Sequence, residues 1–198
     1  SVELDMQLKS SFYLNQDVTA VARELLGKVM VTKTPRGRTA GIIVETEAYS
    51  YRERGCHAYQ NRMTDRNRIM FAPGGVSYVY LIYGIHHMFN VVTNVEGLAE
   101  AVLIRALEPI EGIELMQSRM GASTPRRITS GPGKLAKALG IDREWNGKSL
   151  QSSDLWIEDA GMGDVPVTKS RRIGIDYAGR DASKLWRFSI KGNTWVSQ

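Results

Sequence analysis

The segment GIIVETEAY, residues 41–49, carries the acidic groups best suited to chemistry. In a β-strand, successive side chains alternate between two faces. One face would be mostly apolar and pack into a core: Ile42, Val44, Thr46 and Ala48. The other would carry Ile43, Glu45, Glu47 and Tyr49. Carboxylates two residues apart lie about 6.5–7 Å apart along a strand, and partial burial of such a pair raises at least one pKa. This suits a general base that activates water. The alternative is an exposed edge strand whose acids have no catalytic role.

Two polar residues interrupt apolar strands elsewhere. Arg105 lies between Ile104 and Ala106 in AVLIRALEP, and a buried arginine needs a carboxylate or another acceptor. Asn90 lies between apolar neighbours in MFNVV, where a polar side chain usually makes hydrogen bonds. A cleft-facing arginine paired with a glutamate would fit the acidic strand, and a structural role is the alternative for both residues.

The three histidines, His57, His86 and His87, raise the question of a metal site together with Cys56. Adjacent His86 and His87 point to opposite faces of a strand. The pair Cys56–His57 also lacks zinc-ligand spacing. The sequence therefore predicts no metal and no cofactor, and it contains no phosphate-binding or dinucleotide-binding loop.

The stretch YVYLIYGIHHMFNVV, residues 78–92, predicts a β-hairpin that turns at Gly84. Hairpin tips usually carry Asn, Asp, Gly or Ser. Here Tyr83 and Ile85 flank the glycine, and turn chemistry does not explain two large side chains at an exposed tip.

The elements predicted around these candidate residues form a mostly antiparallel sheet. Residues 17–27 predict a helix, and residues 28–34 and 39–49 predict two paired strands. Strands are also expected at 100–109, 154–159, 170–175 and 185–192, with helices at 110–121 and 131–140. Residues 50–75 predict a long loop, and such loops are often functional. Because strands do not alternate regularly with helices, we expect an α+β fold rather than a doubly wound one.

The chain has 198 residues and one cysteine, which predicts a single domain spanning 1–198 in a reducing cytoplasm. No apolar run approaches the roughly 20 residues needed to cross a bilayer. The net charge is +5, and basic residues concentrate in residues 52–72, 117–148 and 167–191. This pattern is compatible with a polyanionic partner.

Taken together, the motifs resemble those of the alkyladenine (3-methyladenine) DNA glycosylase family. The matching stretches run in order from about residue 11 to the C-terminus: VETEAY (44–49), His57, DRNRIMF (65–71), PGGVSYVYLIYG (73–84), Asn90, VLIRALEP (102–109), SGPGKL (130–135) and RRIG (171–174). The resemblance implies a single mixed domain around a curved antiparallel sheet, with a hairpin that enters the minor groove of DNA.

The resemblance also implies an activity. Such enzymes are monofunctional and act in base excision repair, where they flip alkylated or deaminated purines out of duplex DNA and hydrolyse the N-glycosidic bond. The substrates expected are 3-methyladenine, 7-methylguanine and hypoxanthine, and a monomer without cofactor or metal is expected. No lysine lies in the matched active-site motifs, which favours hydrolysis over a lyase step. Bound to DNA, a bacterial enzyme of this kind would associate with the nucleoid.

Roles for individual residues follow from the same resemblance. Glu47 matches the general base and Arg105 the arginine beside the attacking water. The base pocket would be lined by Tyr49, His57 and Tyr80, and Asn90 would exclude normal guanine. Tyr83, with Ile85 beside it, would intercalate into the base stack. Lys134 and Gly174 match DNA-contacting positions.

Two departures and two alternatives accompany this interpretation. Ile85 stands where some relatives carry methionine, and residues 50–64 are less similar than their flanks. A non-catalytic module for damaged DNA or structured RNA is one alternative, but the acids of residues 45–47 favour catalysis. A glycosidase acting on soluble sugars fits poorly with the three basic segments.

Overall fold

Two long antiparallel strands form the centre of the sheet: β2 (Gly37–Ser50) and β5 (Glu100–Glu111). The computed structural model describes residues 6–197. The strands follow the order β3-β4-β5-β2-β1-β6. In addition, β8 pairs with residues 45–47 of β2, and β7 pairs with β8. The remaining strands are β1 (Val29–Thr34), β3 (Ser77–Ile82), β4 (His86–Thr93), β6 (Leu155–Glu158), β7 (Val167–Ser170) and β8 (Arg187–Ile190). Every pairing of these strands is antiparallel.

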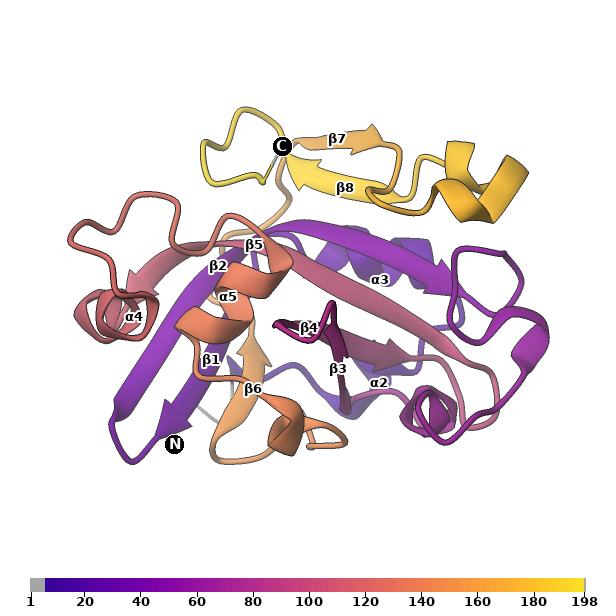
Figure 1. Ribbon diagram of the computed structural model, residues 1–198, viewed down its shortest axis with the longest axis horizontal. Helices are drawn as coiled ribbons and strands as arrows, with labels where there is room; N and C mark the ends of the chain where they lie inside the picture. The colour runs from indigo at the N-terminus through magenta and orange to yellow at the C-terminus, as the bar shows by residue number, and fades with distance from the viewer. Residues whose placement is uncertain (1–5, 198) are drawn as a thin grey trace.

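Within the described part of the chain, four short helices support this sheet: α2 (Ser10–Tyr13), α3 (Val18–Leu25), α4 (Ile113–Met120) and α5 (Pro132–Ala138). Figure 1 shows α5 in front of the central strands and α3 behind them. The Asp17 side chain accepts hydrogen bonds from two backbone N–H groups at the start of α3, the usual N-cap arrangement. Together with the sheet, the helices confirm the predicted α+β class. No helix among residues 6–197 is long and apolar enough to cross a bilayer.

The pairing of β2 with β5 is irregular where the chemistry-bearing residues lie. Ile43 pairs with Leu107, Glu45 with Ala106 and Thr46 with Ile104, so Val44 and Arg105 are each left out of the register. Such bulges redirect side chains and often accompany active sites.

The predicted strict alternation of residues 41–49 is therefore wrong. The register shift between Ile43 and Glu45 leaves Val44 as an extra residue, which interrupts the alternation at that point. Glu47 and Tyr49 lie beyond both register shifts, where the pairing with β5 is regular again.

Most predicted elements are present, with two corrections. The strand expected at 170–175 is wrong: β7 ends at Ser170, and the backbone N–H of Ile173 donates to a side chain instead of a neighbouring strand. Gly174 has a φ of 76°, which also ends extended structure. The helix expected at 110–121 begins at Ile113, because β5 continues to Glu111 and Gly112 turns the chain with a φ of 71°.

The predicted loop at residues 50–75 is compact rather than open. Two 3-10 helices lie later in the chain, η3 (Arg143–Trp145) and η4 (Asp176–Ser183). The loop itself contains two short 3-10 helices, η1 (Tyr59–Asn61) and η2 (Arg68–Phe71). Its buried side chains form a second apolar cluster with β3, β4 and β5, whose members are Cys56, Ala58, Met70, Phe71, Tyr78, Val92, Ala99 and Ala101. This cluster fixes the loop against the sheet.

Candidate active site

A cavity of about 540 Å³ opens between β2, β5, the β3–β4 hairpin, the loop after β2 and the segment after β7. Most of the predicted site residues line it, although they come from separate parts of the chain: Glu47, Tyr49, His57, Tyr80, Tyr83, Asn90, Arg105 and Gly174. Ile85 and Lys134 are not among its lining residues. The tertiary fold thus brings together residues that lie in separate motifs of the sequence.

Glu47 is fully buried and both of its carboxylate oxygens accept hydrogen bonds. Oε1 accepts from the Tyr49 hydroxyl at 2.8 Å, and Oε2 accepts from the backbone N–H of Ile173 at 2.7 Å. Burial raises the pKa of Glu47, while Arg105 and the two hydrogen bonds act in the opposite direction. The site therefore holds a carboxylate in an orientation fixed on both sides, beside the cavity.

Glu45 is equally buried but does not line the cavity. Its Oε1 accepts from the backbone N–H of Ser197 at 2.9 Å, and its Oε2 lies 3.0 Å from Arg187 Nη1. The alternative of an exposed edge strand is wrong, because β2 lies between β5 and β1 and both acids are buried. Of the two acids, only Glu47 faces the space where a substrate would fit.

Arg105 is 7 % exposed and lies between the two glutamates. Its Nη1 is 3.4 Å from Glu47 Oε1, and its Nε is 3.6 Å from Glu45 Oε2. The second distance is too long for a hydrogen bond, so Nε contributes only charge there. The expectation that this buried arginine pairs with a glutamate is confirmed, and its guanidinium also lines the cavity.

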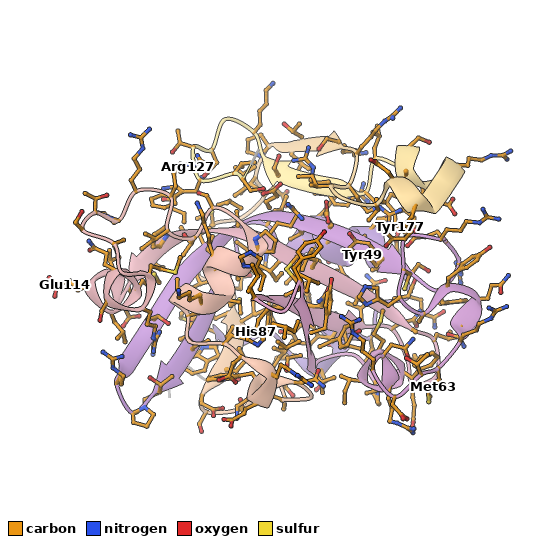
Figure 2. The ribbon with its side chains drawn as sticks, viewed as in Figure 1. Tyr49, Met63, His87, Glu114, Arg127 and Tyr177 are labelled. Carbon is orange, nitrogen blue, oxygen red and sulfur yellow. The ribbon has the colours of Figure 1, made fainter. Side chains whose placement is uncertain are left out.

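Aromatic rings form the walls of the cavity. The His57 ring lies 4.6 Å from the Tyr80 ring, and His57 Nδ1 is 3.1 Å from the Tyr78 hydroxyl. Burial lowers the pKa of His57, and Arg66 lowers it further, so the imidazole is neutral at pH 7. Tyr49 and Tyr177, both labelled in Figure 2, also line this cavity. Flat rings with a neutral imidazole suit a planar ligand.

Asn90 is 4 % exposed and lines the cavity floor from β4. Its Nδ2 donates to the backbone carbonyls of Tyr78 at 3.2 Å and Met88 at 3.4 Å. These bonds fix the direction of the amide. Both the structural role and the pocket role predicted for Asn90 are compatible with this position.

The hairpin tip combines exposure with backbone strain. Tyr83 is 88 % exposed and Ile85 is 69 % exposed. Tyr83 and Gly84 have φ values of 52° and 68°, and the N–H of Ile85 donates to the carbonyl of Ile82. This is a type I′ turn, whose first central position favours Asn, Asp or Gly. Strain of this kind in an exposed aromatic residue indicates a functional position.

Lys134 and Gly174 lie near the rim of the site. Lys134 is exposed in the first turns of α5, and α5 contacts the hairpin because the Gly133 position adjoins the His86 ring. Gly174 has open space where a Cβ would lie, so a ligand can approach its backbone closely.

Several residues of the site were not predicted from the sequence. Arg172, Glu53, Arg66, Tyr78 and Tyr177 surround the cavity or support its walls. The motif RRIG, residues 171–174, marked the correct segment, but only the three-dimensional structure shows that Arg172 is buried. Tyr177 carried no signal, since it follows the motif in an irregular segment.

Known proteins resemble this chain along most of its length. The model of the family described as "Methylpurine-DNA glycosylase (MPG)" matches residues 11–194. A Clostridium acetobutylicum protein named "Putative 3-methyladenine DNA glycosylase" is 44% identical over 201 residues, covering 97% of this chain and 98% of that protein. Proteins of the same name from Chlamydia abortus and Methanocella arvoryzae are 46% and 47% identical and cover 92% and 96% of this chain, with 97% and 96% of their own lengths matched.

The family model and the relatives named as DNA glycosylases match the chain along nearly its whole length, and its cavity holds a buried carboxylate beside aromatic rings. The protein is therefore a DNA glycosylase, a hydrolase of N-glycosidic bonds in DNA. The chain belongs to the methylpurine-DNA glycosylase family.

Proposed function

We propose that this protein flips alkylated or deaminated purines out of duplex DNA and releases them by hydrolysis, with Glu47 as the general base. The observation that carries the proposal is the contrast between the two buried glutamates. Glu45 is occupied by Arg187 and Ser197 away from the cavity, whereas Glu47 lines the cavity beside Arg105. A carboxylate so placed can take a proton from water during attack.

The reaction we propose is a single displacement at the sugar. The water oxygen forms a bond to C1′, the bond from C1′ to the purine breaks, and the bonding electrons leave with the base. Glu47 accepts the proton that the water loses, and its charge stabilises positive charge developing on the sugar. Arg105 holds the carboxylate and the attacking water in place.

Substrate selection would come from the cavity walls. Tyr49, His57 and Tyr80 provide ring surfaces, and electron-poor alkylated purines stack well on such rings. The carbonyl and amide of Asn90 would lie close to the purine edge and exclude the exocyclic amine of guanine. We therefore propose 3-methyladenine, 7-methylguanine and hypoxanthine as the substrate set, with the printed names of the relatives supporting 3-methyladenine.

The hairpin tip would support base flipping. Extrusion of a base costs a few kcal/mol of unstacking, and a side chain inserted into the gap offsets part of that cost. Tyr83 and Ile85 are the exposed residues at the tip, and Lys134 and Gly174 would contact the DNA backbone. We propose that the chain acts as one domain and as a monomer. The cytoplasmic location expected from the sequence stays a prediction.

A lesion panel tests this function directly. Duplexes carrying 3-methyladenine, 7-methylguanine or hypoxanthine are incubated with excess protein in ¹⁸O water, and free base and abasic DNA are measured by mass spectrometry. We expect free purine together with ¹⁸O in the abasic sugar. Tight binding of lesion-containing duplexes without release of any base would instead establish a non-catalytic binding module.

A further inference from the structure

Arg172 lies near the cavity and makes several hydrogen bonds and ring contacts, but it has no part in the proposed reaction. It is 5 % exposed. Its Nη2 lies 2.7 Å from Glu53 Oε1 and 3.1 Å from the Asp181 carbonyl, and its Nη1 donates to the Ala48 carbonyl at 3.0 Å. One guanidinium thus joins β2, the loop after β2 and the segment around η4.

The same guanidinium also lies against two aromatic rings. Its central carbon is 4.9 Å from the centre of the Tyr49 ring and 5.2 Å from that of Trp186. A cation over a ring face restrains both groups. Since planar arginine combines stacking with several directed hydrogen bonds, lysine cannot replace it here without loss of contacts.

Glycine at position 55 is part of this arrangement. A Cβ there would lie 2.7 Å from Glu53 Oε1 and 3.0 Å from the guanidinium of Arg172. The backbone N–H of Gly55 donates to Glu53 Oε1 at 2.7 Å, and its carbonyl accepts from the Tyr177 hydroxyl at 2.9 Å. The loop at 53–55 is therefore fastened to the segment 172–177 at both ends.

The two groups that donate hydrogen bonds to Glu47 from opposite sides both lie next to Arg172. The donor to Oε1 is the hydroxyl of Tyr49, whose ring Arg172 contacts. The donor to Oε2 is the backbone N–H of Ile173, the next residue in the chain. Apart from Arg105, these are the hydrogen-bond donors that reach Glu47 among the described residues.

We propose that Arg172 is a positioning residue for the Glu47 carboxylate, acting through the Tyr49 ring and the Ile173 backbone. The inference rests on the proposed role of Glu47 as general base. It does not require Arg172 to touch DNA or the purine. Arg172 keeps the two donors in place so that the carboxylate presents one fixed orientation to the attacking water.

The ionisation of Glu47 provides a readout of this positioning. Both donors lower the pKa of Glu47, against the larger effect of burial, which raises it. The ionisable groups that face Glu47 from the neighbouring elements are Glu45, Tyr49, Tyr80, Arg105, Arg172 and Tyr177. Arg172→Lys keeps every one of these charges, so a change in the pKa of Glu47 would arise from displaced donors.

The experiment compares Arg172→Lys with Arg119→Lys. Like Arg172, Arg119 donates to a backbone carbonyl, that of Ala138. It differs in being half-buried, in donating also to the Thr34 hydroxyl and in lying outside the cavity lining. We measure single-turnover excision from pH 5 to 9, and follow the Ile173 amide by ¹H–¹⁵N NMR over the same range. Glu53→Gln serves as a milder second variant, in case Arg172→Lys does not fold.

For Arg172→Lys we expect excision to slow about 10- to 100-fold, since small misplacements of catalytic groups have effects of this size. The acidic limb of the pH profile should move to higher pH, because weaker donors favour the protonated carboxyl. The Ile173 amide resonance should shift and lose its titration with Glu47. Glu53→Gln should change all three in the same direction, and Arg119→Lys should change none.

The inference would be overturned by folded Arg172→Lys or Glu53→Gln protein in which the excision rate, the pH limb and the Ile173 amide match the wild type. Failure of the proposed function would look different. If Glu47→Gln retained excision while the Ile173 amide moved in Arg172→Lys, the positioning of Glu47 would stand and its role as base would not.

Discussion

The substitution Tyr83→Asn should separate the DNA-binding role of the hairpin tip from its contribution to folding. Tyr83 is 88 % exposed and has a φ of 52°. A non-glycine residue in the left-handed region costs roughly 1–2 kcal/mol, and asparagine tolerates it well and is favoured before glycine in a type I′ turn. Because the ring contacts little in the free protein, its removal loses little burial energy.

We therefore expect Tyr83→Asn to stabilise the free protein by about 1 kcal/mol. For a chain of this length, that corresponds to a rise in melting temperature of about 2–4 °C. On DNA the effect should have the opposite sign. Loss of aromatic stacking costs about 1–3 kcal/mol per base, which reduces the flipping equilibrium roughly 5- to 150-fold.

Two assays test the opposite signs. Thermal unfolding measures stability, and fluorescence of 2-aminopurine next to the lesion measures flipping, with binding measured at several salt concentrations. Tyr83→Phe is the matched control, since it keeps the ring and should retain flipping. Unchanged flipping in Tyr83→Asn, or a loss of stability in the absence of DNA, would refute the reasoning.

Three other predictions concern buried polar groups. Glu45→Gln should lower the free energy of unfolding in urea by about 3–5 kcal/mol, because Arg105 and Arg187 would lose a buried partner charge; a loss below 1 kcal/mol would contradict this. Burial raises the pKa of Glu47, so the fold favours its neutral form. Relative to the wild type, Glu47→Gln should be equally stable near pH 4 and more stable as pH rises through the raised pKa of Glu47. Unfolding measured at pH 4 and pH 8 would check this prediction. A stability difference that does not change with pH would contradict it. Tyr13→Phe should stabilise the protein by about 1 kcal/mol in calorimetry, since the buried Tyr13 hydroxyl has no hydrogen-bond partner among residues 6–197. Destabilisation would contradict this prediction.

The sequence predicted most strands of the sheet and the position of the strand that carries Glu45 and Glu47. Residues 17–27 have a helical pattern with a capping Asp17, and 28–34 and 39–49 pair as β1 and β2. The apolar surroundings of Arg105 correctly indicated a buried ion pair. These successes share a cause: periodicity and isolated polar residues are local signals.

Other features depend on contacts between distant segments and have no local signal. Alternation could not show the bulge at Val44, which depends on the pairing of β2 with β5. The choice between Glu45 and Glu47 depends on Ser197 and Arg187, more than 140 residues away in the chain. Residues 170–175 were predicted to form a strand, but the backbone N–H of Ile173 donates to the Glu47 carboxylate instead. The positive φ of Tyr83 is likewise visible only in the structure.

The role of Glu47 is tested most directly by single-turnover excision of hypoxanthine and 3-methyladenine from duplex DNA. Glu47→Gln is compared with Glu100→Gln, another buried glutamate on the central strands whose pKa burial also raises, but which lies outside the cavity lining. We predict that Glu47→Gln binds lesion-containing DNA and excises the base about 10²- to 10⁴-fold more slowly, while Glu100→Gln stays within about twofold of the wild-type rate. Excision by Glu47→Gln at the wild-type rate would contradict the account.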